Sequence, residues 1–293
     1  MRKPHHALAG LLVAGATILA ASAHAQETIV RDRFSDEIVG QGPDLVFIPG
    51  LASSRDTWKA TAERLKDRYR LHLIQVAGFA GEPARANAQG PVLVPTAEAI
   101  DAYLVEQHLT PATVIGHSLG GTMILYLAEH HAGDLKKAMI VDSLPFYATL
   151  MLGPNATVET VQPIADGIRS GKSKMTDAQR AQMLAVMATA PADRDMIGGW
   201  SKASDASAVA NAMADDMMLD LRTGLAAITT PITLVYPDYV SIGRPKGGAD
   251  TVYHAAYAPA KTFTFVRADN SVHFIMLDQP AQFNAALDAF LAQ

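Results

Sequence analysis

The sequence predicts an α/β fold, in which a mostly parallel, doubly wound sheet is interrupted by one helical insertion. Three observations lead to this prediction. Short runs of strand character alternate with stretches of helical spacing, and this alternation is typical of a parallel sheet with right-handed crossovers. One β-branched run leads through a glycine-rich turn directly into a helix-like stretch at residues 112–128. Residues 143–228 break the alternation, because they contain no convincing strand.

The first 25 residues have the features of a secretory signal peptide. Residues 2–3 are basic, residues 8–20 are apolar, and residues 23–25 fit the small-x-small cleavage pattern. The apolar run is too short and too rich in alanine for a secure membrane span. We therefore expect a mature chain of residues 26–293 that is periplasmic or secreted and keeps no stable membrane span.

Composition narrows the classes of function. The chain has 293 residues, no cysteine and a formal net charge of −5 at pH 7. The lack of cysteine excludes a disulfide framework, a thiolate nucleophile and a thiolate metal site. No long basic block is present, so nucleic acid is not an expected partner. The mature length suits one large domain with an ample core.

The elements are expected in a regular order along the chain. Residues 27–34 and 37–39 look like a polar hairpin at the start of the mature chain. The continuous apolar run 45–48 suits a strand that is covered on both faces. Further strands are predicted at residues 69–76, 113–115, 138–141, 232–236 and 262–266. Helices are predicted at residues 57–67, 96–108, 118–131 and 280–291, and a loop at 77–95.

Residues 143–228 are expected to form a helical insertion between two parts of one core, residues 26–142 and 229–293. Eight of the twelve methionines of the chain fall in this segment. Methionine is flexible and apolar, and it fills irregular gaps. These side chains either complete a helical core or line the underside of a lid over a substrate pocket, and both roles can hold together.

The turn at residues 116–120 reads Gly-His-Ser-Leu-Gly, with Ser118 at its apex. Between a strand and a helix, the pattern Gly-x-Ser-x-Gly is typical of a nucleophile elbow, a strained turn that lifts a serine hydroxyl clear of the backbone. A side chain at position 116 or 120 would collide with the closely packed strand or helix. The turn also aims a helix N-terminus at the serine. We therefore predict that Ser118 is a nucleophile.

Three motifs resemble the α/β-hydrolase fold superfamily, in its branch of single-domain serine esterases with a helical cap. They are Pro49-Gly50-Leu51, the elbow at residues 116–121, and the run of residues 273–280 that begins His-Phe and ends Asp-Gln-Pro. The resemblance covers roughly residues 43–142 and 229–293. It implies a serine hydrolase with a catalytic triad that cleaves an ester through an acyl-enzyme, with no metal or organic cofactor. Serine at the elbow argues against a dehalogenase or an epoxide hydrolase.

The resemblance also implies a base and an oxyanion hole. The base follows the nucleophile and the acid in the chain, so His254 and His273 are the candidates. We predict His273, because it lies in a loop between the last strand and the closing helix, whereas His254 falls within a helix-like stretch. The oxyanion hole is expected at the backbone N–H groups of Leu51 and Leu119. His117 is expected to be a packing residue.

The acid is the open assignment. Members of the family usually carry it in a Gly-x-x-Asp pattern after the penultimate strand, where this chain has Val240. Asp238 is the carboxylate nearest to the end of that strand and is the first choice. Asp142 is the alternative, because it follows the strand after the elbow helix, a position that some relatives use. Asp250 is a third candidate.

Two other functions stay open at this point. The same triad could serve a lactonase, an amidase or an acyltransferase. A non-catalytic binding protein could also use this fold, because a fold does not determine a function. The methionine-rich insertion and the lack of a basic cluster favour a small, uncharged and mainly apolar ester-like substrate as the partner. The oligomeric state is left open.

Overall fold

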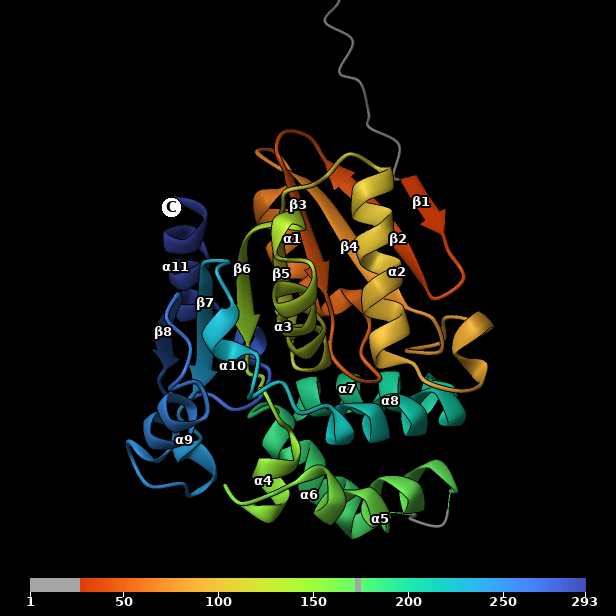
Figure 1. Cartoon of the computed structure of the whole chain (residues 1–293), viewed down its shortest axis with the longest axis vertical. Coiled ribbons are helices and arrows are strands. Elements are labelled where there is room, and N and C mark those ends of the chain that lie inside the picture. The colour runs from red at the N-terminus through yellow and green to blue at the C-terminus, as the bar shows by residue number, and fades with distance from the viewer. Residues whose placement is uncertain (1–26, 172–174) are drawn as a thin grey trace, which may run out of the picture.

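The computed structural model describes residues 27–171 and 175–293 and confirms the α/β architecture (Figure 1). Within these residues, eight strands form one sheet in the order β1-β2-β4-β3-β5-β6-β7-β8. β1 (Glu27–Val30) and β2 (Phe34–Gly40) form the predicted hairpin, and β2 continues antiparallel to β4. All the other neighbours are parallel. The expected signal peptide, residues 1–25, lies outside the described residues.

The parallel part of the sheet is buried because helices cover both of its faces. Its central strands are buried at almost every position, whereas the edge strand β8 is only half-buried. The six strands are β3 (Asp44–Ile48), β4 (Arg70–Val76), β5 (Ala112–His117), β6 (Leu135–Val141), β7 (Ile232–Pro237) and β8 (Phe263–Ala268).

Alternate side chains of the sheet enter two separate cores. Val46 and Ile48 of β3 pack with α2 (Leu93–Glu106), α3 (Leu119–His130) and α9 (Gly248–Ala256). The intervening β3 residues pack on the other face with α1 (Lys59–Leu65), α10 (Ile275–Asp278) and α11 (Pro280–Leu291). Such alternation follows from the two-residue period of a strand.

Short 3-10 helices complete the connections. They are η1 (Arg55–Trp58), η2 (Arg85–Ala88), η3 (Ala132–Asp134), η4 (Leu225–Ala227) and η5 (Val240–Ile242). The predicted loop at 77–95 contains η2 and the first turn of α2, because Pro95 is tolerated in the first turn of a helix. Within the parts of the chain that the structure describes, no helix combines the length and the apolar character needed to span a membrane.

Between β6 and β7, the described residues form α-helices and no strand. These helices are α4 (Ala148–Leu152), α5 (Val158–Arg169), α6 (Asp177–Met187), α7 (Pro191–Ala203) and α8 (Ala206–Met218). Figure 1 shows α7 and α8 below α3 and α2, on the side of the molecule toward which the parallel strands point, with α4 and α5 farther out. Phe146, Val161 and Met217 are at the centre of a small core that belongs to this segment.

Candidate active site

Ser118 lies at the sharp turn between β5 and α3. Its backbone angles, φ 53° and ψ −121°, are strained for a residue with a side chain. A β-carbon at Gly116 would lie 2.5 Å from the carbonyl oxygen of Gly120, and one at Gly120 would lie 2.4 Å from that of Ile48. The predicted collisions at both glycines are therefore confirmed. They show how closely β3, β5 and α3 pack around the serine.

The loop after β3 passes directly over this turn. A β-carbon at Gly50 would lie 3.0 Å from Ser118 Cβ, so the loop reaches the serine only because residue 50 is glycine. Leu119 is the first residue of α3, and its N–H has no acceptor within the helix. Neither this N–H nor that of Leu51 donates a hydrogen bond to a described residue. The two predicted oxyanion donors are thus unengaged beside Ser118.

His273 lies in the loop between β8 and α10, and its imidazole is paired with Asp142. The distance from His273 Nδ1 to Asp142 Oδ2 is 2.6 Å, and both side chains are largely buried. Asp142 directly follows β6 with a left-handed φ of 49°, a conformation that non-glycine residues seldom adopt. Because Nδ1 donates to the carboxylate, Nε2 is left as the ring nitrogen that can accept a proton.

The ring of His273 adjoins the serine turn. Its centroid lies 4.5 Å from that of His117, the residue before Ser118. No hydrogen bond between Ser118 Oγ and His273 is present among the described side chains. In free enzymes such catalytic bonds are often long and tighten in the complex with substrate. The structure thus brings the predicted nucleophile and base into the same small region.

Two tyrosine hydroxyls that sequence analysis missed bind the same carboxylate. Tyr239 donates to Asp142 Oδ2 at 2.7 Å, and Tyr253 of α9 donates to Oδ1. Burial opposes the charged form of Asp142, yet the charge of His273 and these hydrogen bonds hold the pKa of its carboxyl below the ordinary value. Burial and the nearby carboxylate raise the pKa of both tyrosines well above the usual range, so both hydroxyls remain donors.

Asp238, the first choice for the acid, does not contact His273. Its carboxylate accepts the backbone N–H of Val240 at 3.1 Å and so fixes the turn after β7. Asp250, the third candidate, accepts hydrogen bonds from Tyr236 and Arg267. The order of the predictions is therefore corrected: the carboxylate beside the imidazole is Asp142, the alternative.

The other two histidines occupy different places. His254 lies on α9 and stacks on Phe265 with ring centroids 4.2 Å apart. His117 is fully buried, and burial together with the charge of His273 lowers its pKa to about 3. Neutral His117 can therefore donate its Nε2 proton to the carbonyl oxygen of His273, which lies 3.0 Å away. Beyond packing, this hydrogen bond holds the backbone of the histidine loop.

The inserted segment contacts the histidine loop as well. The backbone N–H groups of His273 and Phe274 donate to carbonyl oxygens at the end of α6, at 3.3 and 2.8 Å. Asp278 accepts from the backbone and hydroxyl of Thr189, each at 2.7 Å, and from the N–H of Val272 at 2.9 Å. The position of His273 therefore depends on the insertion and not only on the sheet.

The α8 helix adds a buried acid, Asp216, that sequence analysis also missed. Its side chain is 8% exposed, and its Oδ1 has no hydrogen-bond partner within the described residues. Burial raises the pKa of Asp216 to about 7, and the Thr122 hydroxyl and the charge of His273 partly offset this effect. Thr122 lies one turn after Ser118 in α3 and is hydrogen-bonded to Ser143 at 3.0 Å. A second buried carboxyl thus lies near this region, and its pKa is raised whereas that of Asp142 is lowered.

Comparison with known sequences identifies relatives for most of the chain. The profile of the alpha/beta hydrolase family matches residues 45–286. A pimeloyl-[acyl-carrier protein] methyl ester esterase of Vibrio vulnificus is 35% identical over 109 residues, which are 37% of this chain and 40% of that protein. The protein of the same name in Aeromonas hydrophila is 36% identical over 114 residues, 39% and 42% of the two chains. The matches thus span about two fifths of these curated relatives.

Solved structures share the fold at low sequence identity. A hydrolase from Pseudomonas aeruginosa has a TM-score of 0.73 and 18% identity, over 93% of this chain and 100% of that one. An enol-lactonase from Burkholderia xenovorans has a TM-score of 0.71 and 16% identity, over 89% and 96%. An esterase from Exiguobacterium antarcticum has a TM-score of 0.71 and 19% identity, also over 89% and 96%. At these identities the likeness concerns the fold alone.

Proposed function

This chain belongs to the alpha/beta hydrolase family, and from that premise we propose that it is a serine hydrolase that cleaves carboxylic esters through an acyl-enzyme. The observation that carries the proposal is the pairing of His273 with Asp142 beside the strained turn at Ser118. The three residues occur in the chain order Ser, Asp, His that the fold uses.

The proposed reaction begins with attack of Ser118 Oγ on the ester carbonyl carbon. His273 Nε2 takes the proton of the hydroxyl as the new C–O bond forms, and Asp142 stabilises the imidazolium and fixes its tautomer. The N–H groups of Leu51 and Leu119 bind the oxyanion, and each such donor contributes on the order of 3 kcal/mol to transition-state stabilisation.

Collapse of the tetrahedral intermediate then breaks the ester C–O bond. His273 returns its proton to the departing alcohol, and the acyl group remains on Ser118. Water then attacks the acyl carbon while His273 Nε2 takes one of its protons. The acyl–Oγ bond breaks, His273 returns this proton to Ser118 Oγ, and the acid is released. Because the pKa of Asp142 is held low, its carboxylate stays charged through both halves of the cycle.

We propose that residues 143–228 act as a cap over this site. The hydrogen bonds from the His273 loop to the end of α6 support this role, as does the place of α7 and α8 on the side of the molecule toward which the parallel strands point (Figure 1). The methionines of the segment favour a small, mainly apolar acyl group. Since the curated relatives are named as methyl ester esterases, a methyl ester is a suitable first natural substrate to assay.

The proposal is tested by hydrolysis of short p-nitrophenyl esters. Ser118→Ala is expected to lower kcat/KM at least ~10³-fold, because it removes the nucleophile. Ser207→Ala, at an exposed position on α8, is the matched control and should keep the activity of the natural chain. Activity that survives Ser118→Ala in a folded protein would exclude the mechanism. A panel with lactones and anilides separates an esterase from a lactonase or an amidase.

We further propose that residues 1–25 direct export, on the basis of their basic, apolar and small-x-small pattern. Expression of the full chain in a Gram-negative host, followed by fractionation and N-terminal sequencing, tests this proposal. A periplasmic product that begins at Gln26 is expected. A cytosolic product that retains residues 1–25 would contradict it.

A further inference from the structure

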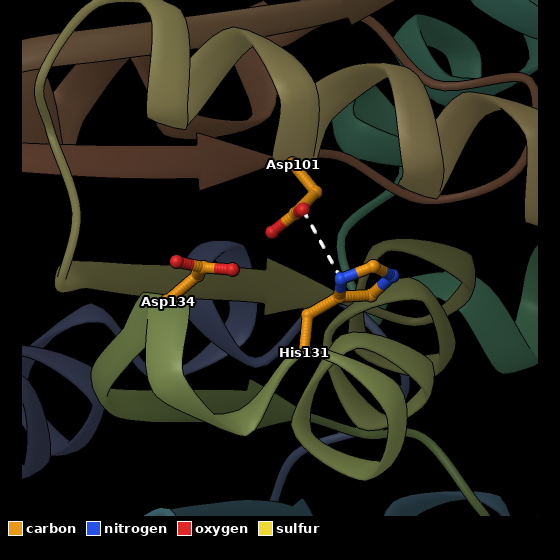
Figure 2. Close-up of side chains that lie close together, drawn as sticks. All are labelled: Asp101, His131 and Asp134. Atoms are coloured by element: carbon orange, nitrogen blue, oxygen red, sulfur yellow. Dashed lines mark ion pairs between the residues drawn. The ribbon is translucent and has the colours of Figure 1, made fainter.

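A second group of ionisable side chains lies where α2 meets the end of α3 (Figure 2). Asp101 comes from α2, His131 directly follows α3, and Asp134 belongs to η3. One ligand atom from each residue lies within 4.8 Å of the other two. Figure 2 shows both carboxylates on the same side of the imidazole, and Asp101 Oδ2 is 3.3 Å from His131 Nδ1. Ser118 is at the opposite end of α3, about 18 Å away along a helix of twelve residues.

One oxygen of this group has no partner. Asp101 is only 6% exposed, and its Oδ1 is buried without a hydrogen bond to any described residue. A buried carboxylate oxygen in this state is costly. The two carboxyl groups face a single imidazole nitrogen, and neither is paired with a lysine or an arginine among the described residues.

The other nitrogen of His131 is already fixed. Nε2 lies 3.1 Å from Glu98 Oε1, and the same oxygen accepts the Tyr126 hydroxyl at 2.6 Å. A histidine that binds a metal commonly donates its second ring N–H to a carboxylate in this way, which sets its tautomer. With a proton on Nε2, the lone pair of Nδ1 points toward Asp101 and Asp134. The positive charge that these three groups favour can come from a second proton on His131 or from a bound cation, and the unpartnered Oδ1 of Asp101 favours the cation.

We propose that Asp101, His131 and Asp134 bind one divalent transition-metal cation, such as zinc. An imidazole nitrogen and two carboxylate oxygens suit zinc, and a water molecule can complete four ligands. Ligand atoms around a tetrahedral zinc ion lie about 3.5 Å apart, so a small rotation of the half-buried Asp134 side chain closes the set. The ion would join α2, the end of α3 and η3, and so would stabilise the fold at a distance from the reaction.

The test is zinc binding to protein that has first been stripped with a chelator. Isothermal titration calorimetry is expected to give one tight zinc ion per chain, and Tm should rise with zinc concentration because only the folded chain holds the site. Asp134→Asn should weaken this binding by more than about tenfold. Asp195→Asn, at an exposed position on α7, is the matched control and should bind zinc as the natural chain does.

Binding of cobalt gives a second readout that does not depend on activity. A visible absorption band from a His-containing cobalt site should appear in the natural chain and in Asp195→Asn, and should be lost in Asp134→Asn and His131→Ala. Equal zinc affinity of the natural chain and Asp134→Asn would overturn the proposal, and so would tighter binding of magnesium or calcium than of zinc. A proton shared by His131 and Asp101 would then account for the arrangement. The proposed ester hydrolysis at Ser118 does not depend on this site, so neither result bears on that proposal.

Discussion

Asp142 and Asp238 directly follow two neighbouring parallel strands, β6 and β7, at the same edge of the sheet, yet only Asp142 reaches the imidazole. Asp142 has a left-handed backbone and accepts hydrogen bonds from His273, Tyr239 and Tyr253. Asp238 instead accepts the N–H of its own loop. A strand thus brings a carboxylate to the edge of the sheet, but the backbone of the one or two residues after the strand decides where the carboxylate points.

The largest effect is expected from Asp142→Asn. An amide cannot stabilise the imidazolium and favours the wrong tautomer, so kcat/KM for a p-nitrophenyl ester should fall about 10³- to 10⁴-fold. Unchanged circular dichroism and an unchanged Tm would show that the loss concerns chemistry and not folding. A loss of less than tenfold in a folded variant would remove Asp142 from the proposed triad.

A smaller loss is expected from Tyr253→Phe. A hydrogen bond to a charged group contributes about 1.5–3 kcal/mol, so removal of this donor should lower kcat/KM roughly 10- to 100-fold. In the natural chain this hydroxyl helps to hold the pKa of Asp142 below its ordinary value, so its removal raises the pKa of Asp142 in the folded protein. The stability that this carboxylate contributes is present above its unfolded pKa and is lost as the pH falls through the lower folded value. The variant should therefore be less stable than the natural chain at pH 7 and approach it in acid.

Tyr236→Phe is the matched control for Tyr253→Phe. Its hydroxyl donates to Asp250 rather than to Asp142, although the two tyrosine rings stack 4.6 Å apart. Tyr236→Phe should keep at least about half of the activity. Equal losses in the two variants would mean that ring packing, and not the hydroxyl on Asp142, supports the site.

Asp216→Asn tests a second buried carboxyl. Its Oδ1 has no hydrogen-bond donor among the described residues, whereas both oxygens of Asp142 accept hydrogen bonds. Its folded pKa is about 7 and its ordinary value is 3.8, so the folded protein holds the proton more tightly. Stability should therefore fall as the pH rises from about 4 to about 7, by at most about 1.4 kcal/mol per pH unit.

The asparagine variant cannot ionise and should escape this loss. Its Tm relative to the natural chain is expected to increase over the same pH interval and then level off. A difference in Tm that does not change with pH would show that Asp216 does not hold a proton in the folded protein.

The smallest effect is expected from Asp238→Asn. The amide oxygen of asparagine can still accept the N–H of Val240, so the turn after β7 should persist. Hydrolysis of the p-nitrophenyl ester should change by less than about threefold, because the side chain does not contact His273. A loss comparable to that of Asp142→Asn would mean that Asp238 also supports the reaction, against the contacts seen in the structure.

Much of the sheet could be predicted from the sequence, because apolar runs and the glycine-serine turn have local causes. The closing helix at residues 280–291 and the strand at 232–237 agree with the predicted ranges within one residue. His273 is preferred to His254 as the base because of its position at the edge of the sheet. Leu51 and Leu119 are predicted as oxyanion donors from the resemblance to the family. Their roles stay predictions until the variants are assayed.

The rest depended on contacts that local sequence does not contain. The choice between Asp142 and Asp238 rests on one backbone angle and one turn. Tyr239 and Tyr253 reach Asp142 from about 100 residues away.

The helices of the insertion could be found in part from local sequence. Thr176 and Gln179 form a capping box at the start of α6, and this pattern predicts the first residue of a helix. Asp101 and His131 lie 30 positions apart, and only the packing of α2 on α3 brings them together.

The most direct test of the account is labelling by a fluorophosphonate, which reacts only with an activated serine. Peptide mass spectrometry should locate one adduct on Ser118 in the natural chain, with labelling slowed strongly in Asp142→Asn and almost unchanged in Asp238→Asn. An unlabelled Ser118 in folded protein, an adduct on another serine, or equal slowing in both variants would contradict the account.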